Sequence, residues 1–119
     1  MDLSAFQKLN AERSQRWHNG NLGQWSLLEW TGAMCGEAGE AANTAKKIKR
    51  LANNLPNIDA GLSVTDKDAL EANLAAEIAD TIIYGLIILS MLEMPASKVI
   101  ADVFNAKSIE YGFPERAEP

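Results

Sequence analysis

The sequence predicts an all-α fold, a four-helix chain that packs like a bundle. Three observations favour this class. Apolar residues recur with helical spacing along most of the 119 residues, and no segment keeps the alternation typical of strands. The one Asn-Gly pair, Asn19-Gly20, follows a helical segment instead of joining two alternating runs. The length suits a single domain over residues 1–119.

The first two helices have clear stop and start signals. The first covers residues 3–17 and ends at the breaker cluster 18–21. The second begins near Gln24 or Ser26 and extends to Leu51. Its last turns are rich in lysine and arginine, at the helix end that favours cations.

The second half of the chain predicts a loop and two more helices. Residues 53–61 are rich in Asn and Gly and form the clearest loop. Thr65 or Asp66 can then cap a third helix that lasts to Glu93. A proline separates it from a fourth helix over 96–110, which ends before a glycine.

The third helix is apolar around most of its circumference, at Ile78, Ile82, Ile83, Leu86, Ile87, Ile88, Leu89, Met91 and Leu92. Such a helix needs neighbours on nearly all sides, and three short helices supply too few. We therefore predict a homo-oligomer, a dimer or tetramer, with this helix in a shared bundle. The apolar run Thr81 to Leu92 has 12 residues, against roughly 20 for a bilayer span, so we expect a core helix and no membrane partner.

Composition limits the partners and the compartment. The 11 basic and 16 acidic residues give a net charge of −5, which argues against nucleic-acid binding because that requires basic surface. The single cysteine, Cys35, has no neighbouring base, and we interpret it as a buried apolar residue. Because the N-terminus lacks a signal-peptide pattern, we expect a cytoplasmic protein.

Two acidic pairs are the most informative feature: Glu37 with Glu40 on the second helix, and Glu77 with Asp80 on the third. A spacing of three puts each pair on one helix face, and antiparallel packing can bring all four carboxylates together. Such oxygen ligands suit Mg²⁺ or Mn²⁺, and no Cys/His set suits zinc. Glycines at 36 and 39 suggest close backbone approach. Exposed acids on an amphipathic face are the alternative.

Residues around the acids suggest a nucleotide. Lys47 lies seven residues beyond Glu40 on the same face, ~10 Å away, within reach of distal phosphates. Tyr84 shares the face of Asp80. Aromatic rings that can stack on a base cluster upstream, at Trp17, His18, Trp25 and Trp30. Taken singly, a Trp is more often a core residue and His18 a cap or surface residue, but their clustering favours a pocket lined by one or two of them.

The acidic segments resemble a known family. Gly36-Glu37-Ala38-Gly39-Glu40-Ala41 and Glu77-Ile78-Ala79-Asp80-Thr81-Ile82-Ile83-Tyr84 are similar to the two acidic motifs of the all-α nucleoside triphosphate pyrophosphohydrolases of the MazG type. Residues 104–108 and 111–114 resemble the C-terminal segment of short members. The resemblance runs from roughly Trp17 to Arg116, and the paired motif is shared by dUTPase, dCTP pyrophosphatase and phosphoribosyl-ATP pyrophosphohydrolase branches.

The resemblance implies hydrolysis of a nucleoside triphosphate to the monophosphate and pyrophosphate, in house-cleaning or control of nucleotide pools. It implies Mg²⁺, or Mn²⁺ in its place, held by Glu37, Glu40, Glu77 and Asp80, with Glu37 or Glu40 also activating water. Phosphates would be contacted by Lys47, Tyr84, Asn105 and Lys107, and the base by Trp17, His18, Trp25 and Trp30. The alternative is a non-catalytic helical oligomer that binds metal or nucleotide for structure or sensing.

Overall fold

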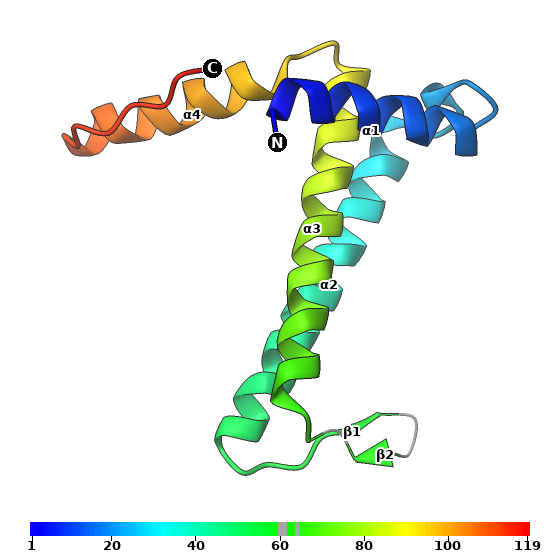
Figure 1. The fold of residues 1–119 in the computed structure, drawn as a ribbon, viewed down its shortest axis with the longest axis vertical. Coiled ribbons are helices and arrows are strands. Elements are labelled where there is room, and N and C mark those ends of the chain that lie inside the picture. Colours follow the sequence, from blue (N-terminus) through cyan, green and yellow to red (C-terminus); the bar gives the residue numbers. More distant parts are fainter. Residues whose placement is uncertain (60–61, 64) are drawn as a thin grey trace. The chain divides into compact units, whose positions relative to one another are not determined.

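The computed structural model describes residues 1–59, 62–63 and 65–119 (Figure 1). It confirms the all-α class, since most of these residues lie in α1 (Leu3–Trp17), α2 (Leu27–Ala52), α3 (Lys67–Met91) and α4 (Ala96–Tyr111). The 3-10 turn η1 (Leu22–Gln24) precedes α2. The chain forms two compact units, here called the hairpin unit (Thr31–Tyr84) and the terminal unit (Met1–Trp30 with Gly85–Pro119).

A short antiparallel strand pair between α2 and α3 was not predicted. β1 (Ile58–Asp59) pairs with β2 (Leu62–Ser63), with Ile58 opposite Ser63. Strands of two residues are too short to produce an alternating pattern, so the sequence indicates only a loop there. Of that predicted loop, Ala60 and Gly61 lie outside the described residues.

Side-chain caps set the helix starts. Ser26 Oγ accepts a hydrogen bond from the Glu29 backbone N–H (3.1 Å), and Glu29 Oε1 accepts one from the Ser26 N–H (3.2 Å), a reciprocal capping box that starts α2. Asp66 Oδ1 accepts from the Ala69 N–H (3.2 Å) and starts α3. Gly112, in the left-handed region at φ 72°, ends α4.

In the hairpin unit, α2 and α3 run antiparallel, side by side (Figure 1). Each carries a buried or half-buried stripe whose members are spaced alternately by three and four residues, which keeps one face of each helix towards the other. We call these positions the hairpin seam: Met34, Glu37, Ala41, Thr44, Ile48 and Leu51 on α2, and Leu70, Leu74, Glu77, Thr81 and Tyr84 on α3. The middle of the seam is therefore small and polar.

Cys35, Gly36 and Gly39 are small residues of α2 that lie outside the seam. Cys35 is exposed, so the prediction that it is buried is wrong. The next position after a seam residue turns about 100° away from the partner helix, which explains the exposure. A Cβ added at Gly36 or Gly39 would meet no atom within 4 Å, so these glycines mark no close approach among the described residues.

In the terminal unit, one side chain of α1 fastens the α3–α4 turn. Gln7 Nε2 donates to the Met94 carbonyl (2.9 Å), and Gln7 Oε1 accepts from the Ala96 N–H (2.8 Å). The buried face of α1 is polar, with Asn10 and Ser14 almost fully covered. Ser14 Oγ has no hydrogen-bond partner among the described residues.

The apolar character of α3 extends further than the run recognised in the sequence. By length and composition alone the helix could cross a membrane, a test that the core helix of a soluble protein passes equally. Only 11% of its apolar window is buried within the chain. Leu86 and Ile87 are buried in the terminal unit, whereas Ile78 and Ile82 remain about half exposed in the hairpin unit. Much of this helix is therefore exposed among the described residues.

Candidate functional site

The two acidic pairs lie in the middle of the hairpin unit. Glu37 and Glu77 occupy facing stripes of the seam and are half-buried, while Glu40 and Asp80, three residues further along each helix, are exposed. The Glu37 carboxyl is hydrogen-bonded to Glu40 and lies within electrostatic range of Glu77 and Asp80. Antiparallel packing thus gathers one acidic pair from each helix. We call these four side chains the acidic cluster.

The cluster raises the pKa of Glu37. Loss of hydration is the largest cause, followed by repulsion from Glu40, the hydrogen bond between the two carboxyls, and repulsion from Asp80 and Glu77. All of these act against a negative charge on Glu37. A bound cation would relieve this repulsion.

One carboxylate oxygen of Glu77 has no hydrogen-bond partner among the described residues. This atom, Oε2, is buried. The hydroxyl of Thr81 donates to the Glu77 backbone carbonyl (2.9 Å) and not to the carboxylate. A buried carboxylate oxygen normally has a donor or a metal as partner. An all-oxygen donor set is what Mg²⁺ prefers. In the part of the chain that the structure describes, however, no three His, Cys, Asp or Glu side chains are arranged to hold a metal ion.

Hydrogen bonds from the following loop hold the backbone of α2 at Lys47. Lys47 is half-buried, two turns beyond Glu40. Its carbonyl oxygen accepts from Asn57 Nδ2 (2.7 Å), and the Arg50 guanidinium donates twice to the Pro56 carbonyl (3.1 and 2.9 Å). These bonds close the loop onto the end of α2 and hold the backbone that carries Lys47. Among the other predicted phosphate ligands, Tyr84 belongs to this unit too, at a half-buried seam position.

Three of the four predicted base-binding residues form a closed cluster in the terminal unit. The ring centroids of His18 and Trp25 are 5.0 Å apart, those of His18 and Trp30 4.9 Å, and those of Trp25 and Trp30 4.8 Å. Rings this close touch and leave no room for a base between them. Trp30 is 2% exposed and its Nε1 donates to the Leu22 carbonyl (3.0 Å). A ligand can therefore stack only on the outside of this aromatic trio, where Trp25 is partly exposed.

Trp17 is separate from the trio. Its side chain is 75% exposed, and the Arg13 guanidinium lies 5.3 Å from its ring centroid. A cation over an indole face at this distance is weakly attractive in water. Trp17 was predicted to bind the base together with the aromatic trio because it is close to them in sequence, but in the structure it is not part of that cluster.

On α4, the two predicted phosphate ligands are engaged with their own unit. Asn105 clamps the main chain of Ala117, donating from Nδ2 to its carbonyl (3.0 Å) and accepting at Oδ1 from its N–H (2.7 Å). Lys107 Nζ pairs with Glu110 (3.0 Å) and lies 5.8 Å from the Tyr111 ring centroid. Sequence reasoning missed the Asn105 clamp, because a contact across twelve residues with an irregular segment leaves no periodic signal.

The predicted site residues therefore fall into two sets. The acidic cluster, Lys47 and Tyr84 belong to the hairpin unit, whereas the aromatic trio, Asn105 and Lys107 belong to the terminal unit. Sequence reasoning also missed the hydroxyls of Thr44 and Thr81 in the seam; the alternating spacing of three and four was the signal that could have found them. No protein-family model, curated protein or solved structure matches the chain.

Proposed function

We propose that this protein is a Mg²⁺-dependent nucleotide pyrophosphohydrolase, which cleaves a nucleoside triphosphate between its α and β phosphates. The observation that carries the proposal is the acidic cluster, in which loss of hydration and three further carboxyls from two helices raise the pKa of Glu37. The resemblance of both acidic motifs to the MazG-type enzymes supports the same reaction. A deoxynucleotide or a non-standard nucleotide is the proposed substrate, in house-cleaning or control of nucleotide pools.

The acidic cluster supplies the donors for the metal. Glu37, Glu40, Glu77 and Asp80 would hold Mg²⁺, or Mn²⁺ with the same oxygen preference. The bound ion would neutralise the triphosphate and lower the pKa of a water molecule. The unpartnered Oε2 of Glu77 supports this role, because a cation would give that buried oxygen a partner.

The chain's own residues have distinct tasks in this proposal. Glu37 or Glu40 orients the attacking water and accepts its proton, since their shared hydrogen bond places two exchangeable sites side by side. Lys47, on its tied-down backbone, contacts the distal phosphates, and Tyr84 contacts a phosphate oxygen.

A pyrophosphate-release assay tests the proposal. Purified protein is incubated with Mg²⁺ or Mn²⁺ and a panel of normal and modified ribo- and deoxynucleoside triphosphates. Glu40→Gln and Asp80→Asn are expected to lower kcat/KM at least about a hundredfold, because both remove a charge from the cluster at exposed positions. Glu71→Gln is the matched control, since Glu71 lies on α3 outside the cluster and pairs with Lys67 (3.3 Å). No pyrophosphate from any nucleotide would end the proposal.

A second candidate is a non-catalytic helical protein that binds metal or nucleotide for structure or sensing. The hydrogen bond between Glu37 and Glu40 favours it, because this contact forms within the chain without a metal ion or a substrate. Isothermal titration separates the two candidates. Tight nucleotide binding that persists without turnover supports the sensor, and turnover with weak substrate binding supports the enzyme.

A further inference from the structure

Two aromatic rings at the end of α4 lie close to parallel without being packed into a core. The ring centroids of Tyr111 and Phe113 are 6.2 Å apart, and the angle between the ring planes is 29°. Tyr111 is 64% exposed and Phe113 is 57% exposed. We call these two residues the aromatic pair. It belongs to the terminal unit and shares no residue with the aromatic trio.

Hydrogen bonds hold the backbone around the aromatic pair. Gly112, in the left-handed region at φ 72°, turns the chain out of α4. The Phe113 N–H donates to the Ser108 carbonyl (2.8 Å), and the Phe113 carbonyl accepts from Arg116 Nη1 (2.8 Å). The Asn105 clamp fixes the segment that follows. Rings on a backbone that is already ordered lose little further freedom when a ligand binds to them.

We propose that the aromatic pair binds a nucleobase, which enters between the two rings and stacks on both. A flat ring in contact with a ring on each face needs about 7 Å between the outer two, since carbon atoms pack at about 3.5 Å. The separation of 6.2 Å is close to this value, and rotation of the exposed Tyr111 side chain supplies the remainder. In the aromatic trio the centroids lie only 4.8 to 5.0 Å apart, too close to admit a ring.

The charges beside the aromatic pair favour recognition of a base over recognition of a phosphate. Lys107 Nζ lies 5.8 Å from the Tyr111 ring centroid, but it is paired with the Glu110 carboxylate (3.0 Å), so the two side chains add no net charge. An ammonium next to a carboxylate offers a hydrogen-bond donor beside an acceptor. The edges of the bases carry both kinds of group. The ligand is therefore a nucleoside, or the base part of a nucleotide.

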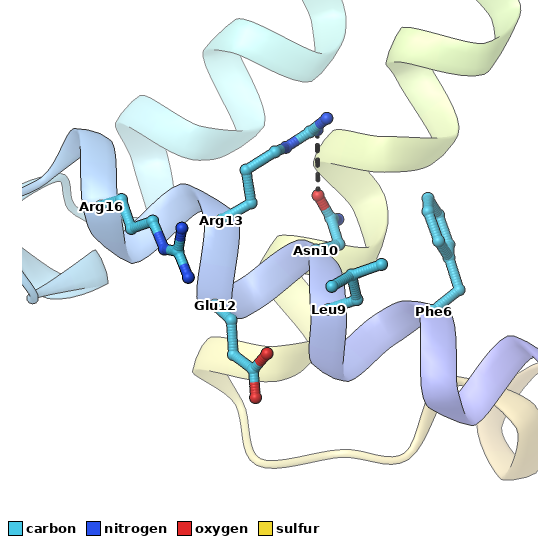
Figure 2. Close-up of a pocket in the computed structure, with 6 residues that line it drawn as sticks. All are labelled: Phe6, Leu9, Asn10, Glu12, Arg13 and Arg16. Atoms are coloured by element: carbon cyan, nitrogen blue, oxygen red, sulfur yellow. Dashed lines mark hydrogen bonds between the residues drawn. The ribbon is translucent and has the colours of Figure 1, made fainter.

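The groove on α1, in the same unit, suits a base less well. Its volume is about 270 Å³, and it is lined by Phe6, Leu9, Asn10, Glu12, Arg13 and Arg16 (Figure 2). Phe6 is the only aromatic residue in this set, so a base in the groove can stack on one ring at most. The Arg13 guanidinium is held by Asn10 Oδ1 (3.4 Å), the hydrogen bond drawn in Figure 2.

A nuclear magnetic resonance titration of the full chain tests the site. Adenosine, guanosine, cytidine and uridine are added separately to isotopically labelled protein without Mg²⁺. We expect the backbone amide resonances of Tyr111, Gly112 and Phe113 to shift and to saturate as one site. Phe113→Leu is expected to weaken this binding about tenfold or more, because it keeps an apolar side chain and removes the flat ring. Phe104→Leu is the matched control, since Phe104 is a half-exposed aromatic residue of α4 outside the pair.

Tyr111→Leu is a second variant with the same expected loss, and circular dichroism shows whether the helices persist. The proposal is overturned if no nucleoside shifts these resonances, or if Phe113→Leu binds as tightly as Phe104→Leu. It is also overturned if methyl glucoside or a polyproline peptide shifts them and nucleosides do not.

This test is independent of the proposed hydrolase, because a nucleoside has no phosphate for a metal to hold. Nucleoside binding by a protein that releases no pyrophosphate would refute the hydrolase alone. Pyrophosphate release without nucleoside binding at the aromatic pair would refute the base site alone.

Discussion

The aromatic trio predicts that two tryptophans respond very differently to the same substitution. Trp30→Phe removes the hydrogen bond from Nε1 to the Leu22 carbonyl, which lowers the free energy of unfolding by about 1 kcal/mol. It also leaves a gap beside His18 and Trp25, because the side chain is 2% exposed, for a further cost of about 1 to 2 kcal/mol. The sum, about 2 to 3 kcal/mol, lowers Tm by roughly 10 °C in a domain of this size.

Trp17→Phe is the matched comparison. It changes an exposed ring that contacts the Arg13 guanidinium, so the expected cost is about 0.5 kcal/mol or less. Urea and thermal unfolding followed by circular dichroism give both values under one buffer condition. If the two variants lose equal stability, or if Trp30→Phe costs less than about 0.5 kcal/mol, the trio is not a packed core and our account of it is wrong.

Three further predictions concern packing, protonation and the C-terminal clamp. Ser14→Ala is expected to stabilise the protein by about 1 kcal/mol, because Ser14 Oγ is buried without a partner among the described residues; Ser90→Ala, which deletes a hydrogen bond, should show no such gain in thermal unfolding. The pKa of Glu37 in the folded state is raised above 4.5, so the folded state binds more protons at this residue than the unfolded state does. The metal-free protein should therefore lose stability as pH rises from 4.5 through that pKa. Glu37→Gln should flatten this part of the profile of stability against pH. Asn105→Ala removes both hydrogen bonds to Ala117 and should accelerate tryptic loss of the C-terminal segment, measured by mass spectrometry; an unchanged rate would show that the clamp does not hold that segment.

The helices could be predicted because their signals are local. The capping box of Ser26 and Glu29 involves residues three apart, and the glycine that ends α4 follows directly after it. Acidic pairing within each helix is equally local, since a spacing of three fixes one face. Such features need no knowledge of the tertiary structure.

Burial was predicted less well, because it depends on which face meets a neighbour. Cys35 and Glu37 both stand among small residues in the sequence, yet the seam passes through Glu37 and leaves Cys35 exposed. Trp17 and Trp30 are equally apolar, but only Trp30 finds a backbone acceptor and two rings to pack against. Asn105 matches a phosphate ligand by motif, while in the structure both polar atoms of its side-chain amide are hydrogen-bonded to the backbone of Ala117.

Periodicity and capping chemistry alone thus define four helices and the acidic pairs on two of them, because both act within one or two turns of the chain. The repulsion of Glu37 by Glu77 and Asp80 arises only when the two helices pack, since those two carboxyls belong to the other helix. The closure of the aromatic trio likewise depends on which surfaces the folded chain covers.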